Sequence, residues 1–352
     1  MTSTWPPIFD GHNDVLLQLY TAGGLPHAEQ FLTGMIGAVD LPKARKGGFG
    51  GGFFAVFVPS PSEEGGIFEQ MKKPEYDLPL PDPVAFEEAV SVVLHQAAIL
   101  FELERKEALR VCRSAAEIET CLSEETIAAI FHMEGAEAID FDLHALDVLH
   151  EAGLRSLGPV WSRPTIFGHG VPFAFPSSPD IGPGLTEAGE RLVKRCNALR
   201  IMIDLSHLNE AGFWDVSRIS DAPLVATHSN AHAITPHARN LTDRQLAAIA
   251  ESDGMVGLNF AVAFLREDGR MIPDVPISQM MRHLDYLIEK LGEDRVGFGS
   301  DYDGAIVPPT ITTIGDLDIL RDEMKNHGFD RALIDKLCFE NWIRVLRKTW
   351  GE

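Results

Sequence analysis

The sequence predicts an α/β protein of the (β/α)8, or TIM-barrel, class, in which eight parallel strands alternate with helices. Eight apolar runs that suit buried parallel strands are separated by segments with helical spacing. The chain has 352 residues, a length that such barrels reach as one domain. Ionisable side chains follow several of the apolar runs, at the carboxyl ends of the strands, where barrels of this class have their active sites. We therefore expect one barrel domain over residues 1–352, with an open doubly wound sheet as the alternative.

The first half of the chain supplies four of the expected strands. Residues 8–14 begin apolar and end polar, and residues 15–20 continue as a helix. The glycine-rich residues 47–52 precede a strand, whereas a phosphate-binding loop follows one, so they do not predict a nucleotide site. The other elements expected here are strands at 53–58, 109–112 (short), 127–135 and 154–161, helices at 84–107, 139–152 and up to residue 125, and a Pro-, Glu- and Gly-rich loop at 60–83.

The second half shows the same alternation. Residues 167–183 are dense in Gly and Pro and indicate a surface loop that can form a wall of the site. Thr186 and Thr242 stand where a helix N-cap is expected. The remaining strands are expected at 201–207, 224–230, 254–260 and 296–301, and the remaining helices at 187–199, 241–252, 277–291 and 333–350.

The composition limits the partners and the compartment. A formal charge of −22 argues against a nucleic-acid-binding surface, which needs a basic face, and against anionic membranes. The four cysteines lack Cys-x-x-Cys spacing and fit the reduced thiols of a cytosolic protein. Residues 1–7 show no signal-peptide pattern, and no apolar stretch reaches the roughly 18 residues of a membrane span. We expect a soluble, cytoplasmic protein.

Five of the expected strands end in ionisable side chains. These are His12, Asp14, Glu134, His207, His228 and Asp301. Imidazoles and carboxylates bind divalent transition metals, and they are costly to bury unless paired or metal-bound. Five ligands exceed what one tetrahedral zinc ion needs, so a Glu134 bridge between two metal ions is the natural arrangement. The alternative is a buried network of histidines and carboxylates without a metal.

Other polar residues carry weaker signals. Ser206 and Ser229 flank two of the histidines, and we interpret them as groups that orient the ligands. The chain has no G-x-S-x-G turn, which disfavours a Ser–His–Asp hydrolase. The other histidines fall mostly on expected helices or loops and are interpreted as structural or exposed; they are His27, His95, His132, His144, His150, His237, His283 and His327.

Seven stretches of the chain form a pattern that extends almost from end to end: residues 10–14 (DGHND), 133–135 (MEG), 203–207 (IDLSH), 228–231 (HSNA), 239–241 (RNL), 299–304 (GSDYDG) and 340–345 (ENWIRV). In these stretches and in their order, the chain resembles the membrane (renal) dipeptidase family of metallopeptidases, family M19 of the amidohydrolase superfamily. The resemblance covers essentially the whole chain. It implies a homodimeric barrel enzyme with two divalent metal ions, Zn²⁺ by analogy, that hydrolyses the peptide bond of dipeptides with metal-activated water.

The resemblance also implies a role for each strand-end residue. The implied ligands are His12 and Asp14 for one metal ion, His207 and His228 for the other, and Glu134 for both. Asp301 resembles the family's acid/base aspartate.

Two positions depart from the family pattern, and both concern substrate binding. Trp161 stands where the family usually has a histidine that supports the developing oxyanion, and His169 in the following loop is an alternative source of an imidazole. His232 stands where an arginine usually binds the substrate carboxylate. Arg239, which matches a family arginine, or Arg163 can compensate. The preferred dipeptides therefore stay open.

The remaining alternatives concern the substrate and the pocket. Tyr302 and Asn259 are expected to line the pocket, although Tyr302 suits core packing equally well. The same metal centre can also serve N-acyl amino acids, β-lactams or other small amides. A non-catalytic member that keeps the fold for binding is disfavoured, because every implied ligand and the acid/base aspartate are present.

Overall fold

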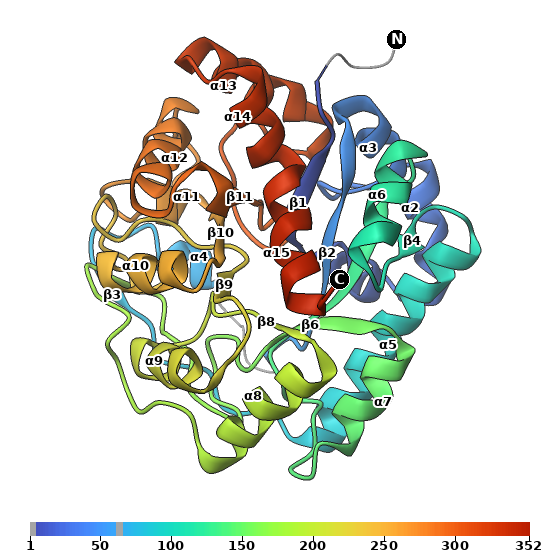
Figure 1. The fold of residues 1–352 in the computed structure, drawn as a ribbon, viewed down its shortest axis with the longest axis vertical. Helices are drawn as coiled ribbons and strands as arrows, with labels where there is room; N and C mark the ends of the chain where they lie inside the picture. Colours follow the sequence, from blue (N-terminus) through green and yellow to red (C-terminus); the bar gives the residue numbers. More distant parts are fainter. Residues whose placement is uncertain (1–4, 61–65) are drawn as a thin grey trace.

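The computed structural model describes residues 5–60 and 66–352, and it confirms a parallel barrel of eight strands (Figure 1). The barrel strands neighbour one another in the order β8-β6-β5-β2-β1-β11-β10-β9. A parallel bridge between Asp204 and Val225 links β8 to β9, so the barrel is nearly closed. Two segments named in the predictions lie outside the described residues: residues 1–4 of the N-terminal segment and residues 61–65 of the loop expected at 60–83.

Each barrel strand lies where the sequence predicts one. The barrel strands are β1 (Ile8–Asn13), β2 (Phe49–Phe57), β5 (Ala128–Glu134), β6 (Leu154–Gly158), β8 (Met202–Ile203), β9 (Val225–Ala226), β10 (Met255–Asn259) and β11 (Val296–Gly299). Three short strands add to them: β4 (Arg110–Val111) pairs with β5, and β3 (Tyr76–Asp77) pairs with β7 (Ala174–Phe175) outside the barrel.

Several predicted strand limits are wrong: β6, β9 and β11 end earlier than expected, and the limits of β2 and β8 differ for identifiable reasons. β2 begins at Phe49 and includes three glycines, because side chains would not fit there: a Cβ on Gly51 would lie 2.0 Å from the carbonyl oxygen of Ala128. β8 ends at Ile203, because the carboxylate of Asp204 accepts the backbone N–H of Ser206 and thereby competes with the strand ladder. The resulting irregular segment leads to the site.

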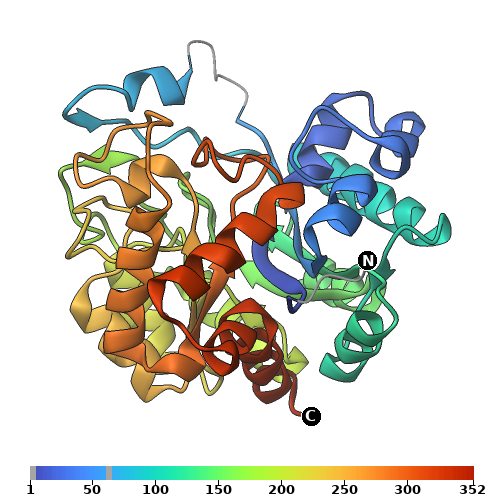
Figure 2. The same cartoon turned by 90° about the horizontal axis from the view of Figure 1, so that it is seen from above.

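Helices cover the outside and the two ends of the barrel (Figures 1 and 2). They are α1 (Val15–Thr21), α2 (Glu29–Thr33), α3 (Leu41–Gly47), α4 (Ile67–Gln70), α5 (Phe86–Arg105), α6 (Ala115–Ser123), α7 (His144–Ala152), α8 (Glu187–Leu199), α9 (Glu210–Ile219), α10 (Asp243–Glu251), α11 (Val262–Leu265), α12 (Ser278–Leu291), α13 (Leu317–His327), α14 (Arg331–Asp335) and α15 (Asn341–Trp350). In the described part of the chain, none of them has the length and apolar character needed to cross a membrane.

Local hydrogen bonds explain where several helices begin. Thr186 and Thr242 cap α8 and α10 as predicted, and Thr242 forms a full capping box. α7 begins later than residue 139, because the carboxylate of Asp140 accepts the backbone N–H groups of His144 and Ala145 and holds the preceding residues in a turn. The helix expected at 333–350 is divided into α14, a π-helical turn (Lys336–Glu340) and α15.

Trp342 of α15 closes one end of the barrel. Its indole nitrogen donates to the carbonyl oxygen of Phe298 at 3.0 Å, and its ring packs on Phe53 at 5.0 Å between centroids. Gly11 leaves room for the ring, because a Cβ there would lie 2.6 Å from it. Figure 2 shows α15 at this end and the light-blue segment that contains α4 over the opposite end. A site inside the barrel must therefore open at the opposite end.

Candidate metal centre

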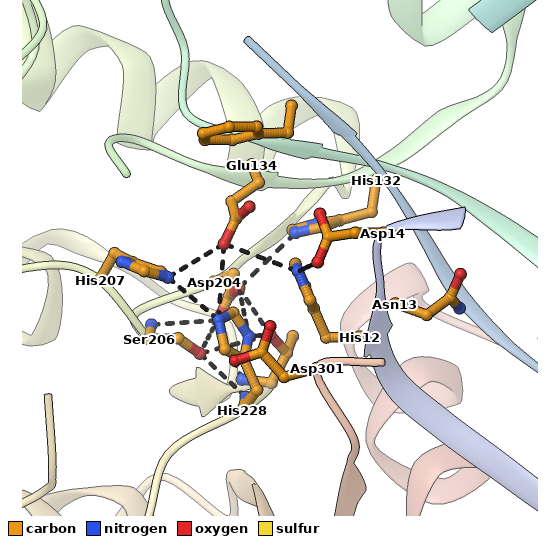
Figure 3. Close-up of polar contacts among 12 residues, drawn as sticks. His12, Asn13, Asp14, His132, Glu134, Asp204, Ser206, His207, His228 and Asp301 are labelled. Atoms are coloured by element: carbon orange, nitrogen blue, oxygen red, sulfur yellow. Dashed lines mark hydrogen bonds and ion pairs between the residues drawn. The ribbon is translucent and has the colours of Figure 1, made fainter. Parts of the chain in front are cut away.

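Side chains from separate strand ends converge on the carboxylate of Glu134 (Figure 3). Its Oε1 atom lies 3.0 Å from Nε2 of His207, 3.5 Å from Nε2 of His228 and 3.6 Å from Nε2 of His12. Nε2 of His12 also lies 3.4 Å from Oδ2 of Asp14. The Nε2 atoms of His207 and His228 are 3.1 Å apart. The structure thus brings together the five residues predicted as metal ligands.

Asp301 lies beside this cluster and is held there by hydrogen bonds to two neighbours. Its backbone N–H donates to the carbonyl oxygen of His12 at 3.0 Å, and its Oδ2 accepts from Nδ2 of Asn259 at 2.9 Å. Gly304 allows the carboxylates to approach, because a Cβ there would lie 2.1 Å from Oδ2 of Asp14 and 2.7 Å from Oδ1 of Asp301. Asn259, expected from the sequence only to line the pocket, is therefore the group that orients the carboxylate of Asp301.

Burial and neighbouring charges set the protonation of the cluster. Burial raises the pKa of Glu134 to about 8, although His12 opposes the shift. Burial lowers the pKa values of His207 and His228 well below the usual range, and the nearby Arg239 contributes. Both rings are therefore neutral at pH 7, and a neutral imidazole is the form that binds a metal ion.

His12 differs from the other two histidines. Burial disfavours its protonated form, but the carboxylates of Glu134 and Asp14 outweigh this effect and raise its pKa to about 10. Neither ring nitrogen of His12 has a hydrogen-bond partner, although the side chain is fully buried. Its Nε2 atom therefore faces two carboxylates whose negative charge a bound cation would balance.

The cluster has the composition and spacing of a metal site. Ligand atoms of His12, Glu134 and His228 lie within 4.8 Å of one another, and so do those of His12, Asp14 and Asp301. An unpartnered buried polar atom costs about 1–3 kcal/mol, which a cation at Nε2 of His12 would relieve. Imidazoles and carboxylates together are typical ligands of divalent transition metals. The residues present therefore fit divalent metal ions.

A row of buried polar side chains behind the ligands fixes the tautomer of His228. Asp204 accepts hydrogen bonds from Oγ of Ser206 at 2.7 Å and from Oγ1 of Thr227 at 2.6 Å. Because the hydroxyl proton of Thr227 goes to Asp204, this hydroxyl must accept from Nδ1 of His228 at 2.7 Å. The ring proton is then on Nδ1, and Nε2 is free to bind a metal ion. No local pattern in the sequence predicts these roles of Asp204 and Thr227.

His132 belongs to the same row, although the sequence predicts only a structural or exposed residue at this position of the expected strand. It lies on β5 two residues before Glu134, so strand alternation directs both side chains into the barrel. Its side chain is fully buried, with Nδ1 2.8 Å from Oγ of Ser156 and Nε2 3.7 Å from Oδ2 of Asp204. The spacing to Glu134 was the signal in the sequence that could have located it.

Replacing Thr227 by Val should weaken metal binding about 10- to 100-fold, the usual effect of losing a group that orients a ligand. The change keeps the side-chain shape but removes the acceptor for Nδ1 of His228. Competition with a chelator measures the affinity. Thr235→Val is the matched control, since Thr235 is equally buried but donates to the carbonyl oxygen of Leu265. Equal affinities in the two variants would contradict the assigned tautomer.

A cavity of about 250 Å³ opens beside the cluster. Its lining has an aromatic part formed by Phe57, Trp161, Phe173 and Phe264, an acidic part formed by Asp14, Glu134, Asp301 and Asp303, and the guanidinium of Arg239. Arg239 is buried and donates to the backbone carbonyl oxygens of Ser206 and His228, the latter at 3.3 Å, while its Nε has no partner. Two residues predicted to bind substrate, Trp161 and Arg239, thus face the cavity.

Four other candidates for substrate binding lie elsewhere. Among the described residues the cavity lining does not include His169, His232, Tyr302 or Arg163. Nε2 of His232 lies 2.8 Å from the carbonyl oxygen of Ser177, and the hydroxyl of Tyr302 donates to the carbonyl oxygen of Ile311 at 2.8 Å. Arg163 is fully buried and forms an ion pair with Glu137 at 2.6 Å, so it is not available to a substrate carboxylate.

Comparisons with known proteins agree with this geometry. The family model described as "Membrane dipeptidase (Peptidase family M19)" matches residues 3–350. A crystal structure of a metallo peptidase from Rhodobacter sphaeroides, liganded with a phosphinate mimic of the dipeptide L-Ala-D-Ala, is 55% identical with a TM-score of 0.96, covering 98% of this chain and 100% of that chain. The structure of the dipeptidase AC, an M19 metallo peptidase, is 55% identical with a TM-score of 0.95, covering 99% of each chain.

A relative from Klebsiella pneumoniae, described as an uncharacterized protein in the pqqA 5′ region, is 47% identical over 265 residues. The match covers 75% of this chain and 98% of the relative. The family model covers almost the entire chain, and the two solved structures share both its fold and more than half of its residues. The chain therefore belongs to the membrane dipeptidase family of metallo-dipeptidases, peptidase family M19.

Proposed function

We propose that this protein is a binuclear zinc dipeptidase that hydrolyses the peptide bond of dipeptides. The observation that carries this proposal is the convergence of three imidazoles on Oε1 of Glu134. We assign the ligands as His12 and Asp14 for one ion, His207 and His228 for the other, and Glu134 for both. When bound, such ions lower the pKa of a water molecule and polarise the scissile carbonyl group.

Asp301 is the proton carrier in this proposal. Its carboxylate lines the cavity and is oriented by Nδ2 of Asn259. Burial raises its pKa, with Asp14 adding to the effect, so the carboxyl group is better matched to proton transfer near neutral pH than an exposed aspartate. It accepts the proton of the attacking water and then delivers it to the amine that leaves.

The cavity supports a substrate of dipeptide size. Its volume of about 250 Å³ is slightly below the ~300–1,000 Å³ of pockets for drug-sized ligands. Arg239 lines it, and we assign this guanidinium to the substrate carboxylate. Trp161 contributes to the aromatic wall that would contact the substrate side chains. The dipeptide mimic bound by the Rhodobacter sphaeroides peptidase supports the same substrate class.

We further propose a cytoplasmic homodimer with one domain per chain. The four cysteines are free and buried, which fits a reducing compartment. The homodimer rests on the resemblance to the family. Light scattering on the purified protein tests it, and a monomer mass would refute it.

Metal analysis and a dipeptide library test the proposed function together. We expect two zinc ions per chain in the active protein, and hydrolysis of dipeptides from a set with L,L and L,D stereochemistry. N-acyl amino acids, assayed in parallel, test the alternative amide substrates. A protein without stoichiometric divalent metal, or one that cleaves only the acylated compounds, would contradict the proposal.

A further inference from the structure

Asp303 is a carboxylate in the cavity that the metal centre does not use. It lines the same cavity as Asp14 and Asp301. It belongs to none of the groups of described side chains whose spacing suits a metal ion. Its backbone has a φ of +69°, a left-handed conformation that is uncommon for a residue with a side chain and often marks a functional position.

The carboxylate of Asp303 is held rigidly but has no counter-ion. Its Oδ1 accepts the backbone N–H of Ala38 at 2.6 Å, and its Oδ2 accepts that of Val39 at 3.2 Å. Within the described chain it forms no ion pair with a Lys, Arg or His side chain. The nearby Lys43 is occupied, because its Nζ binds Asp40 and donates to the carbonyl oxygens of Met35 and Gly37 at 2.8 Å. A cation brought by a ligand would therefore complete the site.

Asp303 and Arg239 lie beside different ligands of the metal centre. The segment that carries Asp303 abuts Asp14, since a Cβ on the adjacent Gly304 would lie 2.1 Å from Oδ2 of Asp14. Arg239 lies on the side of the histidine pair, where its guanidinium donates to the carbonyl oxygen of His228. A dipeptide at neutral pH carries an ammonium group on one side of its peptide bond and a carboxylate on the other. The cavity lining offers the carboxylate of Asp303 for the first group and the guanidinium of Arg239 for the second.

The geometry points to Asp303 as the residue that binds the free α-ammonium group of the substrate and so selects dipeptides over N-acylated amino acids. This inference rests on the proposed dipeptidase function. The other cavity carboxylates have been assigned to metal binding and proton transfer; they are Asp14, Glu134 and Asp301. The ammonium group of a dipeptide is separated from the scissile carbonyl by one carbon atom. Its partner must therefore lie next to the metal centre, as Asp303 does.

A pair of substrates that differ only in the amino group tests this role. The zinc-loaded full chain is assayed with L-Ala-D-Ala and with N-propionyl-D-Ala. Asp303→Asn should lower kcat/KM for the dipeptide about 10- to 100-fold, mainly through KM, which is the range of a charge-assisted hydrogen bond. The kcat/KM for N-propionyl-D-Ala should change by less than about threefold, because this compound has no ammonium group for Asp303 to bind and a small change is typical of a weak, screened charge effect. The preference for the dipeptide therefore falls.

Lys43→Met is the matched control, because Lys43 holds the same 35–40 segment through two carbonyl oxygens without lining the cavity. It should keep the wild-type preference between the two substrates. The inference is overturned if Asp303→Asn leaves that preference unchanged, or if Lys43→Met lowers it equally, since displacement of the segment would then explain the effect.

A wild-type protein that cleaves neither compound would refute the proposed function rather than this inference. The inference is then decided by calorimetry with phosphinate dipeptide mimics that carry or lack the amino group. Equal affinities of the wild type for both mimics would overturn it, and a preference for the amino form that Asp303→Asn removes would support it.

Discussion

Replacing Asp301 by Asn should lower kcat for dipeptide hydrolysis by at least roughly a hundredfold while the metal content stays unchanged. General acid–base catalysis contributes about 10²- to 10⁴-fold, and an amide can neither accept the proton of water nor return it to the leaving amine. The shape of the side chain is kept, and its remaining oxygen can still accept from Nδ2 of Asn259. Steady-state kinetics and zinc analysis of the same samples measure the two quantities.

Asp10→Asn is the matched control for this variant. Asp10 is a buried carboxylate on β1 that accepts the backbone N–H and the hydroxyl of Ser300, at 2.6 Å and 2.7 Å, and does not line the cavity. Its replacement should lower the melting temperature, whereas kcat should fall far less than in Asp301→Asn. Near-normal turnover of Asp301→Asn would remove Asp301 from the mechanism. A loss of zinc in this variant would instead make Asp301 a metal ligand.

The sequence predicts the residues that end long apolar strands. Glu134 is the last residue of β5, and Asp301 follows β11 directly after Ser300. In such cases two rules are enough to place the side chain: side chains alternate along a strand, and the site of a parallel barrel lies at the carboxyl ends of its strands. The eight strands and the convergence of the metal ligands follow from this reasoning.

Other parts of the site depend on contacts that no local pattern contains. Asp204 and Thr227 form their hydrogen bond across β8 and β9, two strands of only two residues each. Their pairing follows from closure of the barrel and not from periodicity. The loop residues His169 and His232 are similar cases, because the direction of a loop side chain depends on the hydrogen bonds that it forms with nearby backbone groups. An example is the contact between Nε2 of His232 and the carbonyl oxygen of Ser177.

Replacing Glu134 by Gln should reduce the metal content from two ions per chain to one or none and lower kcat/KM by at least about a thousandfold. A bridging carboxylate contributes several kcal/mol, and about 4 kcal/mol corresponds to a thousandfold change in rate. The amide removes the negative charge at the point where the Nε2 atoms of three imidazoles meet, and it places an N–H donor near nitrogens that must act as ligands. Zinc analysis and kinetics on zinc-loaded protein measure both effects.

The stability of the same variant separates a metal-binding role from a structural one. Burial raises the pKa of Glu134 to about 8, so its ionised form costs stability in the metal-free fold at neutral pH, where the unfolded chain ionises it freely. The metal-free Glu134→Gln variant should therefore melt at or above the metal-free wild type, whereas added zinc should raise the melting temperature of the wild type more than that of the variant.

Glu137→Gln, three residues after the end of β5, is the matched control, because Glu137 is equally buried but pairs with Arg163 at 2.6 Å. Losing this partner leaves a buried guanidinium without its counter-charge, which typically costs about 3–5 kcal/mol. Its melting temperature should fall with and without zinc, while its metal content stays at two ions. A metal-free Glu134→Gln protein that melts as low as Glu137→Gln would show that Glu134 stabilises the fold by itself, and the bridging role would then lose its main support.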